Sequence, residues 1–430
     1  MLKILLCCAL LPLSIGSMNG ADFSGVVHDS ETGKPIAGAI VTAGANVTLT
    51  DVKGAFKIAG GGTAVLARAY GYRRSQAVVD ARDATAIELK LTAIAPHALY
   101  LSFWGVGTAS VREPALRLAG SSGINAVVID VKGDLGKICY RTAVPLATQI
   151  GAEKTLTVPD IGALLKSLHA RGIYTIARIV TFKDNVLGSA RPALAVHRNG
   201  KPFRDSEGLI WCDPFLPEVR KYNVDLAVDA AKAGFDEIQF DYVRFPADKG
   251  VEFSQPSTSE SRPKTILAFL QEARESLKPY NVFLAADVFG YICWNKGDTG
   301  IGQDITVLAG TLDYICPMLY PSGFMYGIPG YRNPIDNPYQ IVRLSLERAR
   351  ERTKVDPVRF RPWLQAFADY AFDKRQFGQA EIQAQIKGAD TAESDGWMLW
   401  NPRNVYSAKA IEPGAGKILA TAISGVRRPQ

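Results

Sequence analysis

Two aspartates, Asp241 and Asp287, have the setting that acid–base chemistry requires. Each lies near the end of a short run of apolar residues whose composition predicts a β-strand. A carboxyl group is an acid when protonated and a base or nucleophile when ionised, so two carboxyl groups in different surroundings can divide these tasks. Such a division requires structural elements that hold both side chains at one place.

The stretch that contains Asp241, residues 234–246, follows a helical run and opens with a glycine, which predicts a strand entered from a helix end. Alternation gives it two faces, a polar one and an apolar one: Glu237, Gln239, Asp241 and Val243 against Ile238, Phe240 and Tyr242. Carboxylates are not buried in a purely apolar core, so the polar face is expected to line a barrel interior. The alternative is a half-exposed antiparallel strand.

From residue 97 onward, strand-like and helix-like segments alternate. Eight segments are predicted to be strands: residues 97–103, 125–131, 173–180, 234–246, 282–289, 312–320, 360–367 and 396–400. Helical segments separate them, which predicts an α/β fold, a (β/α)8 TIM barrel over residues 97–420. Long loops are expected to shape its C-terminal face after strands two, three, four and six, at residues 133–159, 181–214, 247–262 and 322–337.

Polar and aromatic side chains gather near the carboxyl ends of the predicted strands. Alternation places on one face, from different strands, Asp130, Lys132, Arg178, Asp241, Asp287, Tyr320, Gln365 and Trp400. Each alone has a structural explanation, such as an ion pair, a cap or core packing. Together, carboxylates, cations and aromatic plates are what a sugar site needs, and Tyr242 and Arg244 complete the candidate substrate-binding set.

Glycoside hydrolysis uses two carboxyl groups across the scissile bond, one protonated as acid and one ionised as nucleophile or base. Asp241 and Asp287 are expected at the ends of adjacent strands, whose backbones lie about 4.8 Å apart. Basic residues expected nearby, Arg178, Lys132 and Arg244, would keep Asp241 ionised, whereas apolar neighbours would favour neutral Asp287. Asp241 is therefore assigned as nucleophile or base and Asp287 as acid. Retaining and inverting hydrolysis both stay open.

Three motifs of the predicted barrel resemble a known family. Residues 235–246 (FDEIQFDYVRFP), 286–290 (ADVFG) and 313–322 (DYICPMLYPS) are similar to the bacterial putative glycosyl hydrolase domain family. The resemblance runs from residue 99 to residue 406. It implies a TIM-barrel glycosidase, for which a polysaccharide or oligosaccharide is the expected partner.

A more distant similarity is to the chitinase barrel, whose fourth strand reads Asp-Gly-x-Asp-x-Asp-x-Glu and whose sixth strand carries Met-x-Tyr. The acidic positions correspond here to Asp236, Gln239, Asp241 and Val243, and the second motif to Met318 and Tyr320. Val243 replaces the acid Glu of chitinases, and Gln239 replaces the middle Asp. The acid of a hydrolase with this sequence therefore has to come from elsewhere, and Asp287 is the nearest candidate.

Residues 22–93 have a different pattern, in which short β-type runs alternate with turn signals, and this predicts a small all-β sandwich. Four segments are similar to the carboxypeptidase regulatory-like domain: 25–29 (GVVHD), 32–39 (TGKPIAGA), 50–56 (TDVKGAF) and 69–72 (AYGY). The resemblance implies a transthyretin-type accessory module, which would either bind glycan or act as a spacer.

The N-terminus predicts export. Residues 1–21 combine Lys3, an apolar run and small residues, the pattern of a signal peptide, so a periplasmic or extracellular location is expected. No later segment is long and apolar enough to span a membrane. The net charge of +7 is spread along the chain without basic runs, so nucleic acid is not an expected partner. A monomer is favoured.

Metal-ligand patterns are missing from the sequence. The four histidines are scattered, and the four cysteines beyond the signal peptide match no zinc spacing, so no catalytic metal and no cofactor are expected. Those cysteines are Cys139, Cys212, Cys293 and Cys316. Cys139 and Cys212 could form a disulfide, or all four could be buried thiols.

Two functions remain open, an exported glycosidase and a glycan-binding protein on a hydrolase barrel that has lost activity. The presence of Asp241 and Asp287 on neighbouring strands favours the first. Val243 at the acid position of chitinases favours the second. The placement and ionisation of the two carboxyl groups would distinguish them.

Overall fold

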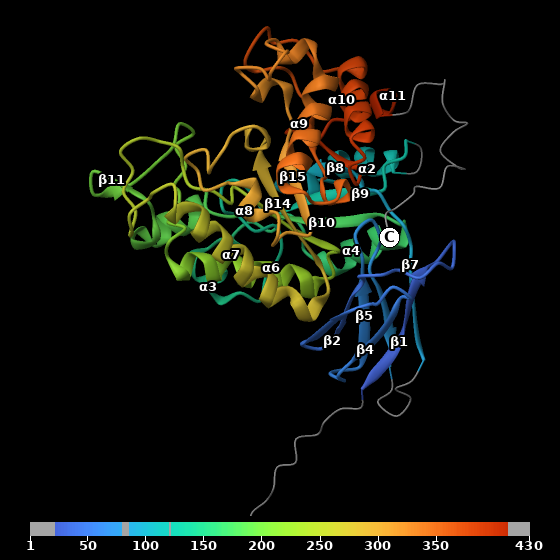
Figure 1. The fold of residues 1–430 in the computed structure, drawn as a ribbon. Helices are drawn as coiled ribbons and strands as arrows, with labels where there is room; N and C mark the ends of the chain where they lie inside the picture. The colour runs from blue at the N-terminus through green and yellow to red at the C-terminus, as the bar shows by residue number, and fades with distance from the viewer. Residues whose placement is uncertain (1–21, 80–85, 120–121, 412–430) are drawn as a thin grey trace, which may run out of the picture.

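The structure, a computed structural model, describes residues 22–79, 86–119 and 122–411, and the predicted signal peptide lies outside these residues. The N-terminal strands form two sheets (Figure 1). One sheet joins β4 (Ala55–Ile58), β1 (Phe23–Asp29) and β7 (Ile87–Leu91). The other joins β3 (Asn46–Leu49), β2 (Ile40–Ala43), β5 (Ala64–Arg68) and β6 (Ser75–Val78). Inward residues such as Val27, Val41 and Leu89 pack into a core of their own, as alternation predicts.

Eight parallel strands close the barrel, so the predicted TIM-barrel fold is confirmed. In chain order they are β8 (His97–Leu101), β9 (Ala126–Lys132), β10 (Tyr174–Val180), β13 (Glu237–Asp241), β14 (Phe283–Phe289), β15 (Tyr314–Met318), β16 (Trp363–Gln365) and β17 (Trp397–Trp400). The parallel pairing of β13 with β14 puts Asp241 and Asp287 on adjacent strands. The antiparallel alternative is therefore excluded.

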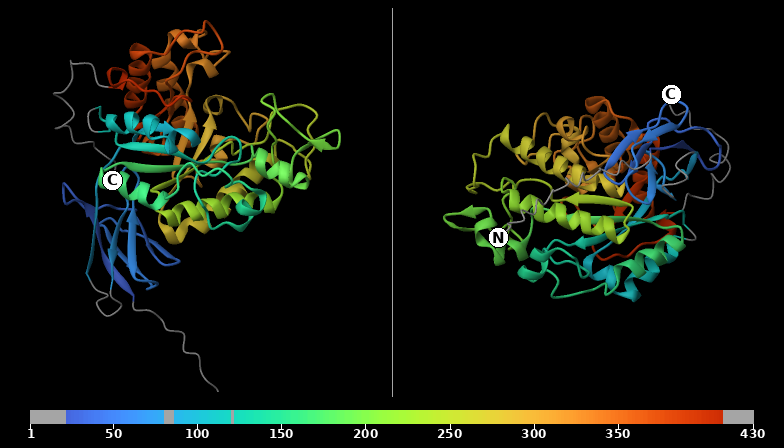
Figure 2. Two further views of the ribbon diagram at one scale, coloured as in Figure 1. Left: turned by 180° about the vertical axis from the view of Figure 1, so that it is seen from behind. Right: turned by 90° about the horizontal axis from the view of Figure 1, so that it is seen from below.

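Helices surround the barrel (Figures 1 and 2). They are α1 (Phe103–Gly107), α2 (Ala109–Leu118), α3 (Pro145–Ile150), α4 (Ile161–Ala170), α5 (Asn185–Ala190), α6 (Pro217–Ala233), α7 (Ser261–Leu277), α8 (Ile305–Leu308), α9 (Pro338–Thr353), α10 (Gln379–Thr391) and α11 (Ala408–Ile411). The helix that delivers the chain to β13, α6, has proline in its first turn and ends at Gly234 with φ 114°, a left-handed value that glycine adopts easily. The loop after β10 carries a small hairpin, β11 (His197–Arg198) with β12 (Lys201–Pro202).

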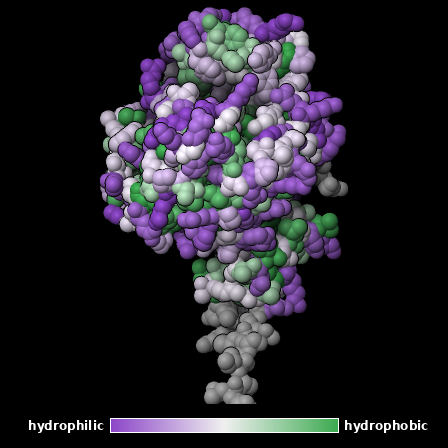
Figure 3. Space-filling view, turned by 90° about the vertical axis from the view of Figure 1, so that its left-hand side faces the viewer, coloured by the Kyte–Doolittle hydropathy of each residue, from purple (hydrophilic) through white to green (hydrophobic). Residues whose placement is uncertain are grey.

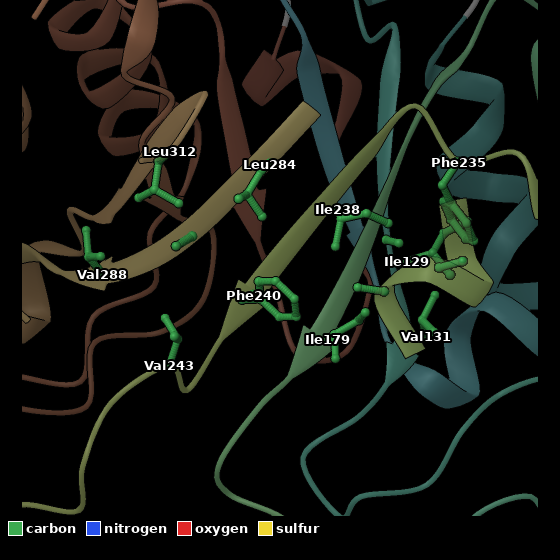
Figure 4. Packing of buried hydrophobic residues seen from close by; sticks show 14 of the residues in the cluster. Ile129, Val131, Ile179, Phe235, Ile238, Phe240, Val243, Leu284, Val288 and Leu312 are labelled. Atoms are coloured by element: carbon green, nitrogen blue, oxygen red, sulfur yellow. The ribbon is translucent and has the colours of Figure 1, made fainter. Parts of the chain in front are cut away.

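The barrel strands separate two cores. Side chains on the outer face, including Ile238, Phe240 and Leu284, pack against the helices (Figure 4). Inside the barrel, a second cluster of apolar side chains surrounds polar side chains that point inward from β13. Glu237 is fully buried there and accepts hydrogen bonds from Arg361 at 2.7 Å and from the Tyr174 hydroxyl at 3.0 Å. The polar face of this strand thus lines the barrel, as expected.

Regular alternation fails just beyond Asp241. The strand ends there, rather than continuing to residue 246, because Tyr242 has φ 49°, in the left-handed region. The turn sends Val243 to the outer core beside Val288 instead of to the polar face (Figure 4). A non-glycine residue in this conformation directly after a buried carboxylate is a form of local strain found at functional sites.

The N-terminal sheets lie against the end of the barrel where the strands begin (Figures 1 and 2). Arg68 donates to Asp313 at 3.3 Å, and the Tyr70 ring lies 6.2 Å from that of Tyr314, so Tyr70 covers the bottom of the barrel interior. Asn281 donates to the Thr42 hydroxyl at 2.8 Å. These buried contacts join the two parts of the chain away from the C-terminal face.

Among the described residues, no helix combines the length and apolar character needed to cross a membrane. Cys139, Cys212, Cys293 and Cys316 are all buried, free thiols. The possible disulfide between Cys139 and Cys212 is therefore not formed, and the alternative of buried thiols holds.

Candidate active site

Arg178, inward-facing on β10, is the centre of the polar cluster at the C-terminal end of the barrel. Its guanidinium binds three carboxylates: Asp130 at 2.6 Å, Asp241 at 2.6 Å and Asp134 at 3.1 Å. Burial by itself would lower the pKa of Arg178, but the three negative charges outweigh it and raise that pKa well above its usual value. The buried guanidinium of Arg178 is therefore permanently charged and fixes the positions of the three carboxylates.

Asp241 is held by both of its oxygens. Its Oδ2 accepts from Nε and Nη2 of Arg178 at 2.9 and 2.6 Å, and its Oδ1 accepts from the backbone N–H of Tyr242 at 2.6 Å. Three donors thus converge on one carboxyl group, and two of them belong to a cation. The residue that donates this backbone N–H, Tyr242, is also the one in the left-handed conformation, so the turn begins directly at the carboxylate.

Asp287, one strand away on β14, has the opposite surroundings. Its side chain is 1% exposed, its Oδ1 accepts from Nε1 of Trp363 at 2.7 Å, and its Oδ2 has no hydrogen-bond partner among the described residues. Burial, together with the negative charge of Asp241, raises the pKa of Asp287 well above its usual value. A buried carboxyl oxygen with no donor is a position that a proton can occupy, so these surroundings favour the neutral form of Asp287.

Asp130, on β9, connects the cluster to β8. Its Oδ2 accepts from the Tyr100 hydroxyl at 2.6 Å and from the backbone N–H of Phe103 at 3.2 Å. Burial raises the pKa of Asp130 to about 6, although Arg178 opposes the shift. Its bonds hold Arg178 from the side opposite Asp241, which is a positioning role.

Aromatic rings surround these groups. The Trp400 ring stacks on Tyr100 with centroids 3.8 Å apart and lies edge-on to Trp363 at 5.4 Å, while Arg178 lies 4.8 Å above Trp400. Tyr320 follows β15 and lies near both Asp287 and Asp241. Burial is the main cause that raises the pKa of Tyr320 well above its usual value, and the negative charges of Asp287 and Asp241 raise it further. Of the predicted aromatic residues, Trp400 thus packs against Arg178, the partner of Asp241, and Tyr320 lies near Asp287 and Asp241.

Two predicted site residues lie elsewhere or serve another purpose. Lys132 is fully buried and binds Asp184 at 2.8 Å and Asn223 of α6 at 2.7 Å, on the outer side of the barrel. The pairing register shifts between Arg178 and Ile179, which turns Lys132 away from the face of Asp130, so its expected place in the site is wrong. Gln365 is inside, but its amide is occupied by Ser322 and a backbone carbonyl.

Three contributing residues were not in the predicted set: Tyr100, Asp134 and Trp363. Alternation along β16 already places Trp363 on the inner face, so its ring N–H could have been included. Tyr100 would follow from applying the same alternation rule to β8. Asp134 lies in the loop after β9, where side chains do not alternate regularly, so the rule could not have identified it. Within the described part of the chain, no group of three His, Cys, Asp or Glu residues is arranged to hold a metal ion.

Comparison with known proteins finds a matching family model and several similar solved structures. Residues 98–406 match the model of the family described as Putative glycosyl hydrolase domain. Among solved structures, a hypothetical protein from Ruminiclostridium thermocellum is 39% identical to this chain, over 44% of this chain and 97% of its own length, with a TM-score of 0.40. None of the curated proteins matches the sequence.

Two further solved structures share the barrel fold. The PgaB (BpsB) glycoside hydrolase domain from Bordetella bronchiseptica is 14% identical, covers 72% of this chain and 94% of its own length, and has a TM-score of 0.54. The β-galactosidase from the psychrophilic Marinomonas ef1 is 11% identical, with coverages of 71% and 54% and a TM-score of 0.51.

Proposed function

The chain belongs to the Putative glycosyl hydrolase domain family, and from this premise we propose that it hydrolyses O-glycosyl bonds of a polysaccharide, with Asp241 and Asp287 as the catalytic pair. One observation carries the assignment: the two carboxyl groups lie on adjacent strands in opposite environments. Asp241 is bound by cationic and N–H donors, and Asp287 is buried with one free oxygen. Two carboxyl groups whose surroundings separate their ionisation are the arrangement that glycoside cleavage needs.

In this mechanism Asp287 gives its proton to the glycosidic oxygen as the bond to the anomeric carbon breaks. The carboxylate of Asp241 stabilises the positive charge that develops on the sugar, and either attacks the anomeric carbon or activates a water molecule. Asp287 then carries the negative charge, which the Arg178 cation and the Trp363 N–H help to stabilise. Arg178 itself positions Asp241 and takes no part in proton transfer.

Exposed aromatic side chains support a polymeric substrate. They lie at or after the carboxyl ends of several barrel strands: Trp104 in α1, Phe289 at the end of β14, and Tyr326 and Tyr370 in loops. Figure 3 views the molecule from the side of the β11–β12 hairpin, where hydrophobic residues are scattered among hydrophilic ones. Exposed aromatic rings of this kind offer surfaces on which sugar units can stack.

A second candidate is a glycan-binding protein without activity, and one observation favours it. Val243, at the acid position of chitinases, is fully buried in the outer core and can do no chemistry. The protein would then bind sugar through its aromatic plates, with Asp241 and Asp287 as structural groups. Under both candidates we propose that residues 1–21 direct export, and that the N-terminal sheets form an accessory module.

The two candidates differ in one assay. Purified protein is incubated with a panel of polysaccharides, and new reducing ends are counted for the wild type and for Asp241→Asn. Release by the wild type, reduced about 100-fold or more in the variant, supports the hydrolase. Binding to a polysaccharide without any release supports the binding protein instead.

A further inference from the structure

Arg244 lies three residues after Asp241, in the loop that follows β13. Its guanidinium carbon is 4.5 Å from the ring centre of Trp211, 4.9 Å from that of Phe289 and 5.4 Å from that of Tyr242. Trp211 is buried, Phe289 is 42% exposed and Arg244 itself is partly exposed, so the rings hold the guanidinium without enclosing it completely. Such contacts hold an arginine without neutralising it.

The charge of Arg244 has no carboxylate partner within ion-pair distance among the described residues; one nitrogen donates to the backbone carbonyl of Phe245 at 3.1 Å. Arg178, by contrast, binds three carboxylates. Burial lowers the pKa of Arg244; Tyr242, Asp241, Asp248 and Asp205 oppose this shift, but none of these acids lies close enough to form an ion pair with it. A partly buried cation without a counter-ion is costly, and a bound carboxylate would remove that cost.

A second cation of the same kind follows β9. The ammonium of Lys137 lies 5.7 Å from the ring centre of Trp104, whose side chain is 56% exposed. Over the residues that the structure covers, Lys137 too forms no ion pair. The C-terminal face therefore has two places where an exposed aromatic ring, suited to stacking on a sugar, is joined to a cation without an acidic partner.

We propose that this site selects acidic glycans, and that Arg244 binds the carboxylate of an acidic sugar unit next to the catalytic pair. The guanidinium presents parallel N–H groups that fit a carboxylate at two points, and Phe289 supplies the adjoining stacking surface. The inference rests on the proposed function, since it places Arg244 in the substrate groove. It concerns recognition, which is measurable without turnover.

Binding is measured by affinity electrophoresis in gels that contain polygalacturonate, alginate or hyaluronate, and in matched gels with the carboxyl-reduced form of each polymer. Four proteins are compared: wild type, Arg244→Gln, Arg244→Lys and Arg117→Gln. Arg117 is an exposed arginine of α2, so its replacement changes the net charge equally and leaves the barrel mouth intact. Thermal melts of each variant establish that it is folded.

We expect the wild type to be retarded by at least one uronate polymer and at least 10-fold less by its reduced form. Arg244→Gln should lose that preference, Arg244→Lys should keep part of it, and Arg117→Gln should match the wild type. Equal retardation by charged and reduced polymers, or unchanged retardation of folded Arg244→Gln, would overturn the inference. Uronate-selective binding without any released reducing ends would support the selection of acidic glycans but contradict the proposed hydrolysis.

Discussion

At the scale of single residues, the site depends on Arg178, whose positive charge compensates the negative charges of several aspartates. Breaking a buried ion pair costs about 3–5 kcal/mol because the remaining charge loses its partner. Removing Arg178 leaves Asp130 and Asp241 both buried without a cation. The cost depends on pH because protonation of Asp130, whose pKa is about 6, relieves part of the repulsion.

We therefore predict that Arg178→Gln lowers the free energy of unfolding by about 3–5 kcal/mol at pH 7.5 and by clearly less at pH 4.5. Urea denaturation at the two pH values measures both losses. Equal losses at both pH values would show that the acids around Arg178 are not charged in the wild type.

Asp287 has its own effect on stability. A carboxyl group whose pKa is raised on folding contributes stability that is fully present below its unfolded pKa, and this contribution is lost as pH rises through its folded pKa. Asparagine does not titrate. The melting temperature of Asp287→Asn should therefore equal or exceed that of the wild type, by a margin that grows from pH 4 to pH 8. Calorimetry across this range checks the trend, and a margin that shrinks with pH would be incompatible with a neutral Asp287.

At the scale of elements, strand periodicity predicts most of this site and fails at two irregular points. Alternation along ideal strands places Arg178, Asp241 and Asp287 on the inner face because the pairing of β10 with β13 and of β14 with β15 is regular through those positions. It misplaces Lys132 and Val243. The register shift beside β9 and the left-handed backbone of Tyr242 depend on tertiary packing, so no local period in the sequence reveals them.

The irregularity in β9 gives Lys132 a structural role that can be tested. Lys132→Met leaves Asp184 buried without its cation, so the protein should lose about 3–5 kcal/mol of stability. The double variant Lys132→Met/Asp184→Asn should recover much of that loss. For the folded fraction, kcat/KM should stay within about twofold of the wild type. A large rise in KM for a Lys132→Met protein that remains folded would contradict this role and show that Lys132 contributes to substrate binding.

At the scale of the whole molecule, the N-terminal sheets and the barrel are joined by buried contacts. Arg68 and Asp313 are both nearly inaccessible, and Tyr70 closes the barrel bottom. The C-terminal face is left free for substrate. The N-terminal sheets therefore pack against the barrel at the end opposite Asp241 and Asp287.

This joint predicts that the two parts unfold together. Arg68→Met should lower the stability of the full chain by about 3 kcal/mol, and scanning calorimetry should show one transition in both proteins. Lys57→Met provides the control, because Lys57 pairs with Asp22 at an exposed position and should change stability by less than about 1 kcal/mol. A separate transition for the sheets, with the barrel transition unmoved by Arg68→Met, would contradict a shared unit.

The central claim is that Asp241 and Asp287 have different tasks, and leaving-group dependence tests it most directly. A sugar released from the active polysaccharide is converted to its dinitrophenyl glycoside, whose leaving group needs little protonation, and kcat is measured on both substrates. On the polysaccharide, Asp241→Asn and Asp287→Asn should each lose about 100-fold or more. On the aryl glycoside, Asp287→Asn should keep most of the wild-type rate and Asp241→Asn should remain impaired. Identical losses for the two variants on both substrates would contradict the division of roles between them.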